Sequence, residues 1–124
     1  MLIEIDFASE EAIYLQVKNQ IIYLIAARQL KEGDNLPSVR RMAEEIGINM
    51  HTVNKAYSVL RDEGFVHVDR RRGAVVCVDM DKIRAKNEMK QNLQLVLAMG
   101  RCKQLTKEDV HAIVDEIFEE CGGC

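Results

Sequence analysis

The sequence predicts a mainly α fold with a single β-hairpin, in the α+β class, and three observations favour it. Apolar residues recur at helical spacing in three segments of the first half of the chain. Helix-capping residues, glycines and a proline stand at the boundaries of those segments. Alternating apolar and polar residues then flank a basic turn at residues 70–73, which is typical of two antiparallel strands. Three helices followed by a hairpin predict a winged helix-turn-helix.

The first helix is expected from about Glu10 to Arg28, and Ser9 stands where an N-cap residue would accept a free amide of the first turn. Residues 30–37 are expected to form a turn, because Pro37 disfavours helical geometry at the residue before it. The apolar stripe of this helix consists of Ile13, Val17, Ile21, Leu24 and Ile25.

Two short helices separated by Gly47 form the predicted helix-turn-helix. The first covers Val39–Ile46 with Ser38 as its cap, and the second covers about Met50–Glu63 with Asn49 as its cap. Gly47 supplies the positive φ that a sharp stop requires. The residues expected to face the core are Val39, Met42, Ala43 and Ile46, then Val53, Ala56, Tyr57 and Leu60. The opposite side of the second helix offers polar groups to a ligand, namely His51, Thr52, Asn54, Lys55 and Ser58.

A basic β-hairpin is expected directly after this helix. Gly64 ends the helix, and the strands Phe65–Asp69 and Ala74–Val78 flank the turn Arg70–Gly73. This hairpin would be the wing, so residues 1–78 form the predicted winged-helix DNA-binding domain.

Residues 79–124 are predicted to form a helical dimerisation tail. Gly100 is expected to separate two helices, of which the second covers Lys107–Glu120 and begins with a capping box of Thr106 and Asp109. Two helices need a partner surface for their apolar stripes, and a second copy of the chain is the simplest partner. The stripe residues are Ile83, Leu93, Val96, Leu97, Val110, Ile113, Val114, Ile117 and Phe118.

Length and composition limit the class of protein. The 124 residues, 48% of them hydrophobic, suffice for one domain with a small appendage. No apolar run approaches the ~20 residues that span a bilayer, and the N-terminal residues lack the features of a secretory signal. A cytoplasmic protein without membrane association is therefore expected.

The distribution of charge favours a nucleic-acid partner, although the net charge is −3. Residues 28–78 carry nine basic and seven acidic side chains and are the only net-positive part of the chain. Arginine and lysine bind phosphate, and arginine also pairs with the guanine edge. The basic residues that would share one face are Arg40, Arg41, Lys55, Arg70, Arg71 and Arg72, while Glu44, Glu45, Asp62 and Glu63 are expected elsewhere.

Several segments resemble one known family. Pro37–Ala43 (PSVRRMA), Ile48–Tyr57 (INMHTVNKAY) and Leu60–Val66 (LRDEGFV) look like the DNA-binding domain of the GntR-type bacterial transcription regulators. Ala12–Gln16 and Leu30–Asp34 are similar to the opening helix and turn of that family. The short two-helix tail resembles the YtrA-like subgroup, whose members carry a small dimerisation appendage.

The resemblance implies a homodimeric regulator, usually a repressor, that binds double-stranded DNA at a palindromic operator. It implies contacts from Arg40, from the start of the recognition helix and from the wing. Together with the charge argument, the expected DNA-binding set is Ser38, Arg40, Arg41, Asn49, His51, Thr52, Asn54, Lys55, Arg70, Arg71, Arg72 and Gly73. An unidentified small-molecule effector would have to bind at the dimer seam or between the tail and the DNA-binding core.

Four cysteines leave other roles open. Cys121-Gly-Gly-Cys124 has the spacing of a metal or redox pair, which Cys102 or His111 would complete. An inert tail is the simpler interpretation, so neither a metal nor another cofactor is expected. Two alternatives remain, a winged-helix module that binds protein and a regulator that senses metal or redox state through these cysteines. The sequence contains no catalytic motif, so an enzyme is not expected.

Overall fold

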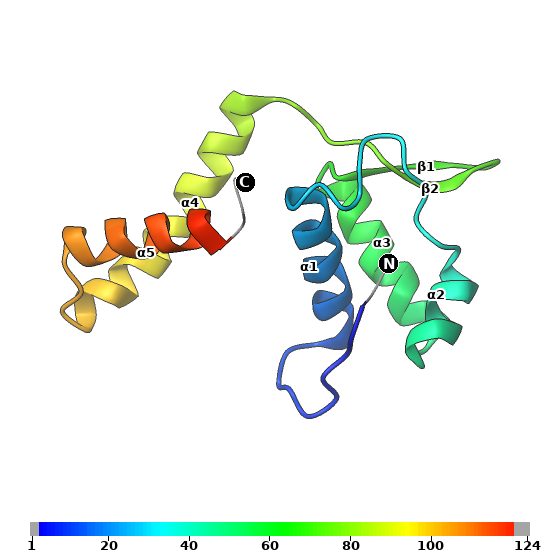
Figure 1. The fold of residues 1–124 in the computed structure, drawn as a ribbon, viewed down its shortest axis with the longest axis horizontal. Helices are drawn as coiled ribbons and strands as arrows, with labels where there is room; N and C mark the ends of the chain where they lie inside the picture. The colour runs from blue at the N-terminus through cyan, green and yellow to red at the C-terminus, as the bar shows by residue number, and fades with distance from the viewer. Residues whose placement is uncertain (1–2, 121–124) are drawn as a thin grey trace. The chain divides into compact units, whose positions relative to one another are not determined.

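The computed structural model describes residues 3–120, and its internal contacts divide the chain between Asp79 and Met80 into two compact units (Figure 1). The elements of the first unit are α1 (Ile13–Ala26), α2 (Val39–Ile46), α3 (Met50–Asp62), β1 (Val66–Asp69) and β2 (Gly73–Val76). Those of the second are α4 (Lys82–Cys102) and α5 (Lys107–Glu120). The fold is mainly helical, with a winged helix-turn-helix and two C-terminal helices, as the sequence predicts.

The core of the first unit lies where α1 and α2 pack against α3, with the hairpin closing one end (Figure 1). Each element contributes apolar side chains that are withdrawn from water, and burying one of these contributes ~1.5–3 kcal/mol. The largest fully buried side chains are Val17 and Ile21 of α1, Met42 of α2, Val53 and Leu60 of α3, and Val76 of β2. The polar side of α3 is therefore fixed by what its other side buries.

The boundaries of α2 and α3 are set by the expected capping residues. The Ser38 hydroxyl accepts a hydrogen bond from the Arg41 amide at 3.1 Å, and the Asn49 side-chain oxygen accepts one from the His51 amide at 2.7 Å. Gly47 adopts φ +72° and ends α2. The end of α3 at Asp62 lies one residue before the expected end. The predicted caps Ser38 and Asn49 and the predicted stop at Gly47 are confirmed.

The predicted start of α1 was wrong by three residues. The helix begins at Ile13, and the Ser9 hydroxyl instead accepts a hydrogen bond from the Glu11 amide within a turn. The Gln16 side chain explains the difference, because its amide donates to the Asp6 and Glu11 carbonyls and its oxygen accepts from the Asp6 amide. These bonds hold the preceding residues as a loop folded against the helix.

The helix α1 also ends earlier than expected, at Ala26 rather than near Arg28. Arg28 adopts φ +60°, in the left-handed region where an ordinary side chain is strained. The backbone therefore leaves the helix before that residue.

The wing is paired more extensively than a simple hairpin. In the antiparallel pair, Val66 lies opposite Val76 and Asp69 lies opposite Gly73. Residues 33–36, which were expected to be only a turn, run along the other side of β2 and form an isolated bridge between Asn35 and Val75. The backbone bonds of this edge are Gly33 amide to Val76 carbonyl at 2.8 Å, Val76 amide to Asp34 carbonyl at 2.8 Å, and Leu36 amide to Ala74 carbonyl at 2.9 Å.

In the second unit, the predicted break at Gly100 was wrong. Gly100 lies inside α4, and the chain turns at Gln104, which adopts φ +64°. A Cβ at Gly100 would lie 3.4 Å from the Leu105 Cδ1, which is ordinary van der Waals contact. The position therefore has space for a small side chain, and Gly100 neither ends the helix nor is required by its neighbours.

The predicted capping box of α5 is confirmed. The Thr106 amide donates to the Asp109 carboxylate at 2.9 Å, and the Asp109 amide donates to the Thr106 hydroxyl at 3.1 Å. Among the described residues, none of the helices has the length and apolar character needed to cross a bilayer.

Candidate nucleic-acid interface

The outward face of α3 carries the polar side chains predicted from the sequence. His51, Asn54 and Lys55 are exposed, and Thr52 is half-buried. They lie three and four residues apart, so they share one side of the helix. The opposite side carries Val53, Ala56, Tyr57 and Leu60, all buried. Packing therefore directs this polar face away from the core.

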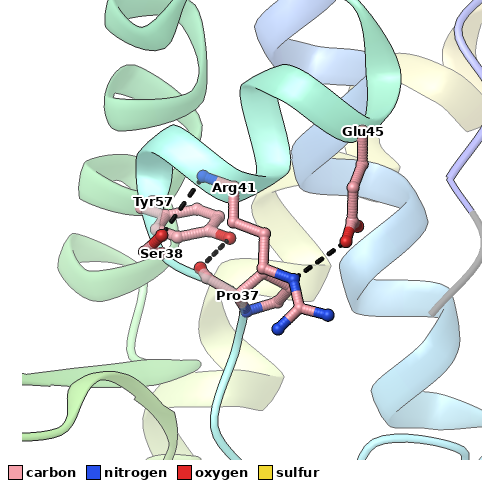
Figure 2. Close-up of polar contacts among 5 residues, drawn as sticks. All are labelled: Pro37, Ser38, Arg41, Glu45 and Tyr57. Atoms are coloured by element: carbon pink, nitrogen blue, oxygen red, sulfur yellow. Dashed lines mark hydrogen bonds and ion pairs between the residues drawn. The ribbon is translucent and has the colours of Figure 1, made fainter.

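Tyr57 connects this helix to the start of α2. Its hydroxyl donates a hydrogen bond of 2.7 Å to the Pro37 carbonyl, immediately before the capping residue Ser38 (Figure 2). Burial raises the pKa of the Tyr57 phenol above its ordinary value, and the Glu45 carboxylate adds to the increase. The phenol therefore stays neutral and remains a hydrogen-bond donor, which fixes the N-terminus of α2 relative to α3.

The two arginines of α2 differ in their surroundings. The Arg41 guanidinium pairs with the Glu45 carboxylate at 2.9 Å, one helical turn away (Figure 2). The expectation that Glu45 lies apart from the basic residues was therefore wrong, because the i, i+4 spacing brings the two side chains together. Arg40 is exposed and, within residues 3–120, forms no ion pair. Arg40 is thus the more available cation.

The wing presents three arginines in different settings. Asp69 accepts a hydrogen bond from the Arg71 backbone amide at 2.7 Å, which shapes the turn, while Gly73 adopts φ +76° at its end. The Arg72 guanidinium reaches back to the Gly33 carbonyl and the Asn35 side-chain oxygen, each at 3.0 Å. In the described part of the chain, the side chains of Arg70 and Arg71 have no such partners.

Lys55 has an aromatic neighbour that sequence reasoning did not anticipate. Its ammonium lies 4.1 Å from the centre of the Tyr14 ring of α1. Such a cation–π contact contributes ~0.5–1 kcal/mol at an exposed site, so it orients the ammonium without preventing a phosphate contact. Tyr14 had been expected only as part of the opening helix.

The expected caps also limit what two site residues can offer to DNA. The Ser38 and Asn49 oxygens each accept a backbone amide of their own helix. The Asn49 side-chain amide and the Ser38 hydroxyl hydrogen remain as donors toward a phosphate. Both residues are exposed, so these donors are accessible.

Sequence reasoning missed Asn35, Gly33 and Tyr14 as neighbours of the site. Their side chains or carbonyls meet basic residues that lie between 37 and 41 positions further along the chain. No local pattern signals such pairing, because it depends on how the loop before α2 and the helix α1 pack. Pro37 and Tyr57 were predicted individually, but not their hydrogen bond.

The described residues offer no support for a metal site. Residues 3–120 contain no cluster of three or more histidine, cysteine or acidic side chains arranged to hold an ion. Cys77 and Cys102 are exposed free thiols, and His111 lies exposed on α5. Cys121 and Cys124 lie outside the described residues, so the predicted Cys-Gly-Gly-Cys pair stays a prediction.

Comparison with known proteins gives a consistent result for the whole chain. The family model for bacterial regulatory proteins of the gntR family matches residues 13–76. The chain is 35% identical over 110 residues to the uncharacterized HTH-type transcriptional regulator YhcF of Bacillus subtilis, covering 85% of this chain and 88% of that protein. It is 31% identical over 125 residues to the HTH-type transcriptional repressor YtrA of the same organism, covering 98% and 96%.

A solved structure agrees with these relatives. It is YtrA from Sulfolobus acidocaldarius, described as a GntR-family transcription factor, and it is 44% identical to this chain. The match covers 76% of this chain and 99% of that one, with a TM-score of 0.62. The matched family consists of transcription regulators and not of enzymes.

Proposed function

The chain belongs to the GntR family of bacterial regulatory proteins, and from that premise we propose that it represses transcription by binding a palindromic operator as a homodimer. The chain is a DNA-binding transcription regulator by its family. The proposal goes further in naming repression, operator symmetry and the dimer.

The placement of α3, the start of α2 and the wing in one compact unit supports the proposed mode of DNA binding. The polar face of α3 is exposed, and it belongs to the same compact unit as the capped start of α2 and the basic wing. A B-DNA major groove is about 12 Å wide and admits a helix of this kind. In this arrangement α3 enters the groove together with Arg40 at the start of α2, while the rest of α2 and the wing contact the backbone on its two sides.

The side chains then divide between reading bases and gripping phosphates. His51 and Asn54 are placed to reach base edges from α3, and Arg40 is a candidate for guanine O6 and N7. Lys55 and Arg70 suit phosphates, because their charges act without regard to sequence. The pairing of Arg41 with Glu45 is exposed and worth only ~0–1 kcal/mol, so a phosphate can replace the carboxylate.

The exposed apolar side chains of α4 and α5 support the proposal of a homodimer. No residue of α4 or α5 is buried, although both helices carry apolar side chains on adjacent turns. Exposed apolar surface of this kind marks an interaction site, and a second identical tail offers a self-complementary partner. The proposed dimerisation residues are Ile83, Leu93, Val96, Leu97, Val110, Ile113, Val114, Ile117 and Phe118, of which only Val110 is half-buried.

Repression is supported by the relative from Bacillus subtilis, whose name describes it as a transcriptional repressor and which matches nearly the full length of this chain. A bound dimer would block access of polymerase to a promoter. In a two-fold symmetric dimer, the two recognition helices would read half-sites whose centres lie about 34 Å apart, one turn of DNA.

Selection of bound duplexes from a random pool tests the proposal directly. We expect enrichment of an inverted repeat, with sedimentation of the DNA-free protein at the mass of a dimer. A promoter that contains the enriched sequence should then lose transcription when the protein is added. An enriched motif without internal symmetry, or a monomer that binds a single half-site, would contradict the dimeric operator complex. An increase in transcription would contradict repression.

A further inference from the structure

The Arg72 side chain is turned toward its own protein. Its Nη2 donates to the Gly33 carbonyl and to the Asn35 Oδ1, both at 3.0 Å. Arg72 is the last residue of the wing turn before β2, whereas Gly33 and Asn35 precede α2 by a few residues. The bonds therefore join the wing turn to the segment that leads into the helix-turn-helix.

Asn35 forms two hydrogen bonds with Arg72. Its side-chain amide donates to the Arg72 backbone carbonyl, while its oxygen accepts from the Arg72 guanidinium. The amide oxygen and nitrogen of Asn35 thus each have a partner on the same residue. This reciprocal pairing, here called the Arg72–Asn35 clamp, fixes both the backbone and the side chain at the end of the turn.

The clamp lies beside a segment that contacts β2 and α3 and leads into α2. Residues 33–36 pair with β2 through backbone bonds, and the next residue, Pro37, accepts the Tyr57 hydroxyl of α3. The backbone pairing reaches Ala74 and stops short of the turn itself. The clamp extends the connection to Arg72, next to the two cations whose side chains point to no protein partner among residues 3–120.

We propose that the Arg72–Asn35 clamp positions the wing turn for DNA, so that Arg72 is a positioning residue while Arg70 and Arg71 supply the wing's phosphate contacts. This rests on the proposed function and changes one of its expected contacts. An uncharged residue, Asn35, thereby becomes as important to the wing as one of its arginines.

Measuring DNA affinity across a range of salt concentrations distinguishes a positioning role of Arg72 from a direct contact between Arg72 and a phosphate. We expect Asn35→Ala and Arg72→Ala to weaken binding to the selected duplex by the same factor, about three- to tenfold, as for loss of a hydrogen bond. Both should flatten the salt dependence equally, because both displace Arg70 and Arg71. Each single variant removes two of the three bonds, because Arg72→Ala leaves the Arg72 carbonyl for the Asn35 amide and Asn35→Ala leaves the Arg72–Gly33 bond. The double variant should therefore bind more weakly than either single variant, but by less than the product of the two factors.

Two further variants sharpen the comparison. Arg72→Lys keeps the charge but not the planar fork, so we expect it to bind more weakly than the original chain. Gln29→Ala removes an exposed side-chain amide of the same unit that forms no side-chain hydrogen bond among the described residues, and it should bind normally. Normal affinity for Asn35→Ala and Arg72→Lys, with a weaker and less salt-dependent Arg72→Ala, would overturn the clamp and make Arg72 a direct phosphate contact.

Hydrogen exchange in the DNA-free protein tests the clamp independently of the proposed function. Asn35→Ala and Arg72→Ala should accelerate amide exchange in residues 70–73 while leaving α1 and α3 unchanged. Unchanged exchange in the turn of both variants would overturn the clamp. If the original chain failed to bind DNA but the turn still loosened in both variants, the proposed function would fail and the contact would stand without its role.

Discussion

Replacing Tyr57 by phenylalanine removes one hydrogen bond from the helix-turn-helix and leaves its packing intact. The hydroxyl donates to the Pro37 carbonyl at 2.7 Å, and Tyr57 is only 5% exposed. A neutral hydrogen bond contributes ~0.5–1.5 kcal/mol net, and a buried carbonyl left without its partner costs ~1–3 kcal/mol. Because Pro37 is half-buried and water partly compensates, we expect the free energy of unfolding to fall by about 1–2 kcal/mol.

Urea denaturation followed by circular dichroism measures this loss. The midpoint should fall while the slope m stays constant, because the surface exposed on unfolding is unchanged. The matched control is Tyr23→Phe. Tyr23 is 70% exposed, and within residues 3–120 its hydroxyl forms no hydrogen bond, so the control should stay within ~0.5 kcal/mol of the original chain.

Equal stability of the two phenylalanine variants would show that the Tyr57 hydroxyl adds nothing to the free energy of unfolding. It would mean that the Tyr57 hydroxyl does not hold Pro37 in solution. The start of α2 would then depend on its capping serine and on core packing alone.

Three other predictions concern the pKa of Tyr57, two glycines and Arg40. Burial raises the pKa of Tyr57 in the folded chain. The contribution of the neutral phenol to stability is therefore complete below the unfolded pKa of about 10 and is lost as pH rises above it, by at most ~1.4 kcal/mol per pH unit. Between pH 9 and 11, the free energy of unfolding should decline less for Tyr57→Phe than for the original chain. Gly47→Ala forces a side chain into φ +72° and should cost about 1–2 kcal/mol. Gly100→Ala lies within a helix and makes only ordinary contact with Leu105, so it should stabilise the chain by about 0.5–1 kcal/mol. A lower midpoint of thermal unfolding for Gly100→Ala would contradict its placement in a helix with space for a methyl group. Arg40→Ala should cost ~1–3 kcal/mol against the selected duplex but less against unrelated DNA, and equal losses in both titrations would exclude base reading by this residue.

Local signals account for the part of the fold that sequence analysis located. Ser38, Gly47 and Asn49 act on their own helix ends, through a side-chain oxygen or a left-handed backbone, so their effect follows from a few neighbouring residues. The same holds for Thr106 and Asp109, which bind each other's amides within one turn.

Non-local contacts account for what sequence analysis missed. Gln16 binds backbone groups up to ten residues earlier and so delays the start of α1. Asn35 pairs with β2, which is formed 40 residues later in the chain. Neither residue type carries a preference for these partners, because the pairing arises only when the helices have packed. Gly100 was misplaced because α4 continues through it and the chain turns only at Gln104, which adopts φ +64°.

In the candidate site, too, local patterns were predictable from the sequence and non-local contacts were not. Sequence analysis identified the outward residues of α3 because a buried stripe fixes the opposite side. It placed Arg70, Arg71 and Arg72 together in the expected DNA-binding set, because the sequence does not show where each side chain points. Only the folded turn distinguishes them, by directing Arg72 toward Gly33 and Asn35.

Titration of the isotopically labelled protein with the selected duplex, followed by amide chemical shifts, shows whether the polar face of α3, the start of α2 and the wing form one DNA-binding surface. We expect the largest shifts at residues 38–41, 49–55 and 70–73, and we expect them to weaken as salt concentration rises. Shifts confined to α4 and α5, with the outward face of α3 unaffected, would contradict such a surface.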